Sequence, residues 1–150
     1  MNRSNRPQPI EILLVDDSAG DVRLAVEALK ESKVSNRVFT VSDGVEAMAF
    51  LRKEGKYKGM RCPDLILLDL NMPRKDGRET LAEIKLDPAL KFIPVVILTV
   101  SSSDEDVFKA YNLYANCYIT KPIDLTQFTR VVNSIDEFWF TIVKLPPKLC

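Results

Sequence analysis

The stretch at residues 65–73 reads Leu65-Ile66-Leu67-Leu68-Asp69-Leu70-Asn71-Met72-Pro73. A short apolar run that ends in polar residues and a proline is typical of a strand buried on both faces of a sheet. An acidic residue directly after such a strand lies at its carboxyl end, where α/β sheets place their ligand sites. Asp69 is therefore the first candidate for a functional residue.

Other apolar runs of the chain also end in polar side chains. The first, at residues 12–15, leads into a pair of acids, and later runs lead into a hydroxyl and an ammonium group. Parallel strands bring their carboxyl ends to one edge of a sheet, so these groups are expected to meet there. The residues concerned are Asp16, Asp17, Thr99 and Lys121. Together with Asp69 they predict a site for phosphoryl transfer.

The remaining pattern predicts five alternating β and α units. Strands are expected at Ile10–Val15, Val38–Val41, Leu65–Leu68, Val95–Leu98 and Asn116–Ile119, and apolar residues recur at helical spacing between them. Such alternation predicts an α/β fold, a five-stranded parallel sheet with helices on both faces, joined by right-handed crossovers. We expect a flexible leader at 1–9, one domain with an extended last helix at 10–143, and a tail at 144–150.

Composition limits the classes of function. The chain has 150 residues, 46% of them hydrophobic, with 21 basic and 21 acidic side chains, which gives no net field to attract nucleic acid or a membrane. There is no histidine, so a histidine triad or histidine metal site is excluded, and any phosphohistidine donor must be another protein. The widely spaced Cys62, Cys117 and Cys150 have no metal-site spacing and suggest a reducing, cytoplasmic location.

The polar residues at the strand ends resemble the motifs of a known family. Asp16-Asp17, Asp69 with Met72-Pro73 and Asp76-Gly77, Thr99, and Tyr118 with Lys121-Pro122 are similar to the receiver domain of two-component response regulators. The resemblance covers residues 10–136 and implies the flavodoxin-like (βα)5 receiver fold. The segment Asn116–Lys121 and the tail Glu137-Phe138-Trp139-Phe140 are similar to the response regulators that partner cyanobacterial phytochromes.

The resemblance implies a role for each site residue. Asp69 would accept a phosphoryl group from a sensor histidine kinase, with Mg²⁺ held by carboxylates and a backbone carbonyl; hard oxygen ligands suit this ion. The protein would be a phosphoacceptor in signalling and would catalyse only its own phosphorylation and dephosphorylation. The implied metal ligands are Asp16, Asp17, Asp69 and the Asn71 carbonyl; Thr99 and Lys121 would contact the phosphoryl group, Tyr118 would act as a switch, and Pro122 would be cis.

The switch predicts how the message is passed on. Movement of Thr99 towards the phosphoryl group would let Tyr118 turn inward and change the face made by the fourth helix, fifth strand and fifth helix. That face would bind a partner or support dimerisation. Phe138, Trp139 and Phe140 exceed what one buried helix face needs, so they indicate either a homodimer through the last helix or an extended core.

Several alternatives remain open from the residues. Asp16-Asp17 could simply cap the following helix. The chain could be an aspartyl-phosphate hydrolase of the haloacid dehalogenase type. In that family, however, the nucleophile follows the first strand, whereas Asp69 follows the third predicted strand, and no residues remain for a cap domain. It could also be a flavodoxin-like binding module, although the two acids would repel a flavin phosphate. The last alternative is a receiver that acts as a scaffold without being phosphorylated.

Overall fold

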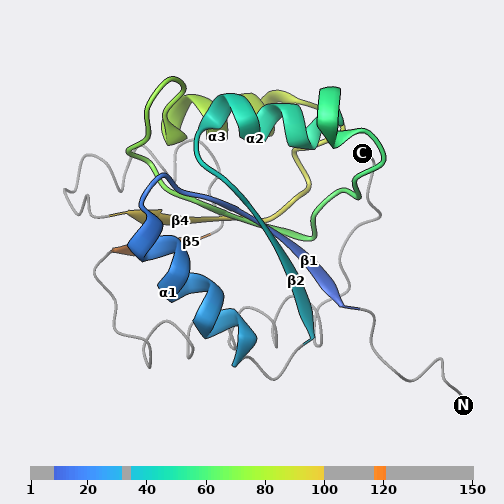
Figure 1. The fold of residues 1–150 in the computed structure, drawn as a ribbon. Helices are drawn as coiled ribbons and strands as arrows, with labels where there is room; N and C mark the ends of the chain where they lie inside the picture. The colour runs from blue at the N-terminus through green and yellow to red at the C-terminus, as the bar shows by residue number, and fades with distance from the viewer. Residues whose placement is uncertain (1–8, 32–34, 100–116, 121–150) are drawn as a thin grey trace, which may run out of the picture.

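A computed structural model describes residues 9–31, 35–99 and 117–120, and the side chains of residues 99 and 117–120 are not described. Strands and helices alternate along the described chain (Figure 1). The strands are β1 (Ile10–Val15), β2 (Asn36–Val41), β3 (Leu65–Leu68), β4 (Val95–Thr99) and β5 (Cys117–Thr120). The helices are α1 (Ala19–Lys30), α2 (Gly44–Leu51), the 3₁₀ turn η2 (Gly55–Tyr57) and α3 (Gly77–Leu86).

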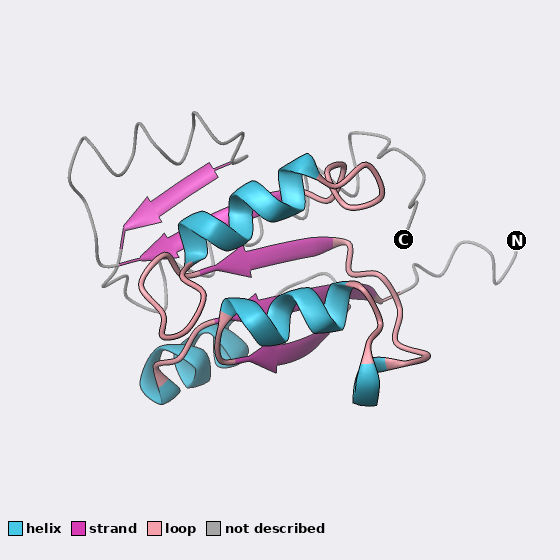
Figure 2. Ribbon diagram, turned by 90° about the horizontal axis from the view of Figure 1, so that it is seen from above, coloured by secondary structure: helices cyan, strands magenta, loops and turns pink. Residues whose placement is uncertain are grey.

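The strands form one five-stranded parallel sheet in the order β2-β1-β3-β4-β5. Viewed from above, all the arrows run in one direction (Figure 2). Helix α1 covers one face of the sheet, whereas α2 and α3 cover the other (Figure 1). The chain reverses its direction of winding between β2 and β3, so the carboxyl ends of β1 and β3 flank a topological switch point.

The predicted strands are confirmed, with small differences at their ends. β2 begins at Asn36 rather than Val38 because it pairs with β1 from Ile10↔Asn36 onward, and backbone pairing continues beyond the apolar residues. β4 includes Thr99, and β5 runs from Cys117 to Thr120. The leader, the fourth and last helices and the tail lie outside the described residues.

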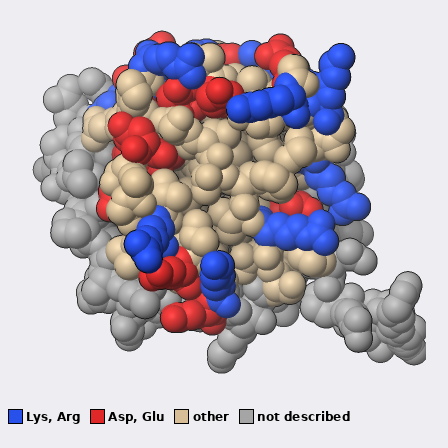
Figure 3. All heavy atoms as spheres, in the orientation of Figure 1, with Lys and Arg blue, Asp and Glu red and all other residues tan. Residues whose placement is uncertain are grey.

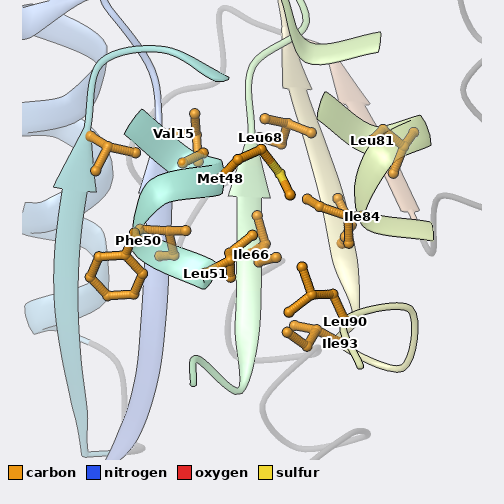
Figure 4. Close-up of a cluster of buried hydrophobic side chains, with 14 of the residues drawn as sticks. Val15, Met48, Phe50, Leu51, Ile66, Leu68, Leu81, Ile84, Leu90 and Ile93 are labelled. Atoms are coloured by element: carbon orange, nitrogen blue, oxygen red, sulfur yellow. The ribbon is translucent and has the colours of Figure 1, made fainter. Parts of the chain in front are cut away.

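Two hydrophobic cores hold the sheet between its helices. Alternate residues of β1 and β3 point to opposite faces, so Leu13 and Ile66 pack towards α2 and α3, while Ile12 and Leu65 pack towards α1. Figure 4 shows the α2–α3 core, where Met48 and Leu51 from α2 and Leu81 and Ile84 from α3 meet the sheet. The central strands are buried on both faces, which explains their uninterrupted apolar sequences.

Each described α-helix begins at a polar residue that caps it. Ser18 caps α1 by accepting a hydrogen bond from the amide of Asp21, and Asp43 and Asp76 do the same for α2 and α3. The alternative that Asp16 and Asp17 cap α1 is therefore wrong. These two acids lie before the cap and remain available for a site.

Cys62 differs from the expectation for the cysteines. It is buried in the α2–α3 core and its sulfur is in a disulfide, whose partner sulfur lies outside the described side chains. No helix among the described residues is long and apolar enough to cross a bilayer. The face in Figure 3 carries interspersed acidic and basic side chains.

Candidate metal and phosphoryl site

The three aspartates predicted to meet do so. Asp16 and Asp17 directly follow β1, Asp69 directly follows β3, and one carboxylate oxygen from each lies within 4.8 Å of the others. Asp16 and Asp69 are only 5% and 6% exposed, whereas Asp17 is exposed. The sheet itself produces this arrangement, because Val15 pairs with Leu68 and the next residue of each strand is the acid.

The backbone holds the two buried aspartates in place. The amide of Asp69 donates to the carbonyl of Val15 (2.9 Å), and the amide of Asp16 donates to the carbonyl of Val41 (3.0 Å), which extends the sheet by one residue. Each carboxylate also accepts from an amide two residues on: Oδ1 of Asp16 from Ser18 (2.9 Å) and Oδ1 of Asp69 from Asn71 (3.2 Å). Backbone hydrogen bonds therefore orient both carboxylates.

The donor set fits a divalent cation. Three carboxylates within such a short distance repel one another, and a cation between them removes that repulsion. Carboxylate oxygens are hard ligands of the kind that Mg²⁺ and Mn²⁺ prefer. The exposed position of Asp17 leaves one side of the cluster open for water and for a further ligand.

The other predicted site residues are only partly described. Thr99 is the last residue of β4, which lies beside β3, so its backbone reaches the same edge of the sheet as Asp69. Tyr118 lies in β5 and pairs with Ile97 of β4. Asn71 lies in the loop between β3 and α3 and is exposed. Lys121 and Pro122 lie outside the described residues, so their predicted roles stay predictions.

An ion pair beside this loop was not predicted from the sequence. Asp43, the buried cap of α2, accepts from Nε of Arg74 (2.8 Å) and lies 2.7 Å from its Nη2. Burial raises the pKa of Asp43, but the amide of Glu46 and the Arg74 guanidinium more than offset it, so the pKa lies below its usual value. The Asp43-Gly44 turn was the only sequence signal at this position.

A polar groove of about 270 Å³ adjoins the site on the side of Asp16. Tyr57 lines it and donates a hydrogen bond to Glu46 (3.0 Å). Burial, followed by this contact with Glu46, raises the pKa of the Tyr57 phenol, so the phenol stays protonated and donates at neutral pH. The groove lies outside the aspartate cluster itself, which it meets only at Asp16.

The fold and the site define a class of protein. The family model for the response regulator receiver domain matches residues 12–133. The chain therefore belongs to the response regulator receiver family, which is a class of phosphoacceptor signalling proteins rather than of metabolic enzymes. Family membership rules out the hydrolase of the haloacid dehalogenase type and the flavodoxin-like binding module, and the position of Asp69 after β3 agrees with this.

Individual relatives are similar to the chain over nearly its full length. The chain is 49% identical over 145 residues to the response regulator Rcp1 of Synechocystis sp. (strain PCC 6803), and the match covers 97% of each chain. The phosphorylated cyanobacterial phytochrome response regulator RcpA is 54% identical, with a TM-score of 0.85 over 93% of this chain and 100% of that one. The Mn²⁺-bound form of Rcp1 is 50% identical, with a TM-score of 0.82 and the same coverage.

Proposed function

We propose that Asp69 is the phosphoacceptor of a response regulator that works with a sensor histidine kinase. The observation that carries this proposal is the cluster of Asp16, Asp17 and Asp69 at the switch point of the sheet. Asp69 is the member of the cluster at the end of the central strand β3, and its Oδ1 accepts a hydrogen bond from the amide of Asn71. Its position makes it the best placed nucleophile of the three.

The reaction is a transfer between two proteins. A carboxylate oxygen of Asp69 attacks the phosphorus of a phosphohistidine on the kinase, so a P–O bond forms while the P–N bond breaks and the imidazole leaves with the electron pair. The chain has no histidine, so the donor group must come from the kinase. The backbone contacts of Asp69 hold the attacking group still, which removes orientational freedom before the reaction.

We further propose that the cation is Mg²⁺, held by the three aspartates and the backbone carbonyl of Asn71. The Mn²⁺-bound structure of Rcp1 supports a divalent ion of this kind. When bound, the ion would neutralise charge on the transferring phosphoryl group. Lys121 would contribute a compact positive charge, Thr99 would donate its hydroxyl to the phosphoryl oxygens, and a cis Pro122 would direct the lysine into the site.

The kinase is proposed to be a cyanobacterial phytochrome, in a cytoplasmic setting. The similarity to RcpA, which is described as a phytochrome response regulator, and to Rcp1 over nearly its full length supports this partner. An inward turn of Tyr118 would report phosphorylation at the face around β5. A homodimer through the last helix and its aromatic tail is part of the same proposal, as is a domain spanning 10–143 between a flexible leader and a short tail.

Phosphorylation with a small donor tests the acceptor. Wild-type protein incubated with phosphoramidate and Mg²⁺ should gain one phosphoryl group by intact mass, and Asp69→Asn should gain none. Asp87→Asn is the matched control, because Asp87 lies at the C-terminal end of α3, outside the aspartate cluster, and pairs with Arg52 instead. It should be phosphorylated as the wild type is.

Two outcomes would contradict the proposal. Labelling retained in Asp69→Asn would place the acceptor elsewhere, and no labelling of the wild type by either phosphoramidate or a phosphorylated kinase would favour the phosphorylation-independent scaffold. Transfer from a phytochrome kinase, compared with transfer from an unrelated histidine kinase, tests the partner. Equal rates from both would remove the phytochrome assignment but leave Asp69 as acceptor.

A further inference from the structure

The loop between β3 and α3 is anchored at both its base and its tip. At the base, the amide of Gly77 donates to the carbonyl of Leu70 (2.9 Å). At the tip, the carbonyl of Lys75 accepts from the amide of Gly44 (3.0 Å), the first residue of α2. Asn71 lies between these anchors, and its amide donates to Oδ1 of Asp69. The position of the loop therefore sets the position of the group that orients Asp69.

The tip of the loop has a backbone that is unfavourable by itself. Arg74 has a φ of 62°, although it carries a side chain that disfavours the left-handed region. Such a conformation persists where surrounding contacts hold it. The guanidinium makes such contacts here: its Nε and Nη2 lie 2.8 and 2.7 Å from Oδ2 of Asp43.

Asp43 is a firm anchor for that guanidinium. Its side chain is 7% exposed, and its other oxygen, Oδ1, accepts from the amide of Glu46 as the cap of α2. The start of α2 is packed closely against the loop and α3. A Cβ on Gly44 would lie 2.6 Å from the carbonyl oxygen of Lys75 and 2.0 Å from Oγ1 of Thr80, which is too close for either contact. The start of α2 and the tip of the loop therefore form one closely fitted unit.

We propose that Asp43 and Arg74 form a clasp that positions the β3–α3 loop and, through Asn71, the carboxylate of Asp69 and the cation site. Both are positioning residues, since neither belongs to the aspartate cluster. The clasp itself does not involve the cation. Its effect on the cation rests on the proposed function, because it requires Asn71 and Asp69 to be ligands.

For Arg74→Gln, the loss of a positive charge and the loss of the clasp predict opposite changes in cation binding. Arg74→Gln removes a positive charge from the neighbourhood of a cation site, so electrostatics alone would tighten cation binding. Loss of the clasp would weaken binding, because the loop no longer holds its ligands in place. We expect the dissociation constant for Mn²⁺, measured by electron paramagnetic resonance, to rise about tenfold, the lower end of the effect of groups that orient metal ligands.

Further variants separate the clasp from general stability. Asp43→Asn keeps a residue that caps helices well but removes the ion pair, and it should weaken Mn²⁺ binding to a similar extent. The double variant should lose little more than either single variant, because the two residues act together. Arg37→Gln is the control: it removes the same charge from an ion pair with Glu11, near the N-terminal ends of β1 and β2, and should leave Mn²⁺ binding unchanged.

Hydrogen exchange of the Asn71 amide provides a reading that does not depend on the metal. In metal-free protein, exchange of this amide should be faster in Arg74→Gln and Asp43→Asn, and unchanged in Arg37→Gln, at temperatures where all remain folded. Unchanged exchange together with unchanged or tighter Mn²⁺ binding in Arg74→Gln would overturn the clasp. A wild type that binds no Mn²⁺ would instead overturn the proposed cation site, while the exchange measurement would still decide the clasp.

Discussion

At the scale of single residues, the fold buries acidic side chains at one edge of the sheet and partly buries a basic side chain near the other. Asp16 and Asp69 are buried acids whose carboxylates accept amide hydrogen bonds at the edge of the sheet. Lys85 is a partly buried base near the opposite edge, where its Nζ donates to the carbonyls of Lys91 (3.0 Å) and Ile93 (2.8 Å). It joins the end of α3 to the turn before β4.

Lys85 predicts a dependence of stability on alkaline pH. Burial lowers its pKa from 10.5 to about 8, so between these values the unfolded chain binds more protons than the folded protein. The contribution of Lys85 to the free energy of unfolding should therefore rise with pH across that window. The slope is at most about 1.4 kcal/mol per pH unit and is reduced by solvent screening, because Nζ is only partly buried.

Urea unfolding at several pH values measures this effect. Lys85→Gln should lose the rise between pH 8 and pH 10.5 that the wild type shows. Lys91→Gln is the control, because it leaves the backbone carbonyl that accepts from Lys85 in place. The assignment is contradicted if the wild type and Lys85→Gln keep a constant difference in unfolding free energy throughout the window.

At the scale of elements, one glycine decides how closely α3 approaches the site. A Cβ on Gly77, the first residue of α3, would lie 2.1 Å from the carbonyl oxygen of Asp69 and 2.5 Å from Cα of Leu70. These are backbone atoms of the strand end, so they cannot move aside as a flexible side chain could. The glycine that follows Asp76 is thus required by packing against the backbone of Asp69 and Leu70 and not by its φ.

Gly77→Ala should consequently destabilise the protein by about 2 kcal/mol or more, the range found for overpacked cores. It should also slow phosphorylation, since Asp69 must shift. Gly20→Ala is the matched control, because nothing lies within 4 Å of its Cβ and alanine favours the helix, so stability should rise by about 0.5 kcal/mol. Equal stabilities of the two variants in thermal unfolding would argue against the close approach.

At the scale of the whole molecule, folding brings like charges together. Asp16 and Asp17 are more than fifty positions from Asp69 in the chain, yet their carboxylate oxygens come within 4.8 Å. An ion that binds only the folded site stabilises the fold by mass action. The stability of the protein should therefore depend on the divalent cation.

Mg²⁺ should raise the melting temperature of the wild type in a concentration-dependent manner. At one hundred times the dissociation constant the stabilisation should approach about 2.7 kcal/mol. Asp69→Asn should lose most of this increase, while Asp87→Asn should keep it. A melting temperature that responds equally to Mg²⁺ in Asp69→Asn and in the wild type would show that the ion binds elsewhere.

The sequence by itself determined the parallel sheet and the meeting of the three aspartates. Both follow from local causes: apolar runs form buried strands, and parallel strands end at a common edge. It also placed Thr99 at the end of β4, as the structure has it. The residues that follow β5 have no counterpart in the described structure.

Only the tertiary structure decided what surrounds those aspartates. Residues 43 and 74 are 31 positions apart, and nothing in their local sequence indicates that Arg74 bonds to the cap of α2 in an unfavourable backbone conformation. The close approach of Gly77 to Asp69 and the disulfide of Cys62 are likewise absent from local patterns. Periodicity reports which face a residue presents, whereas contacts between loops depend on how whole elements pack.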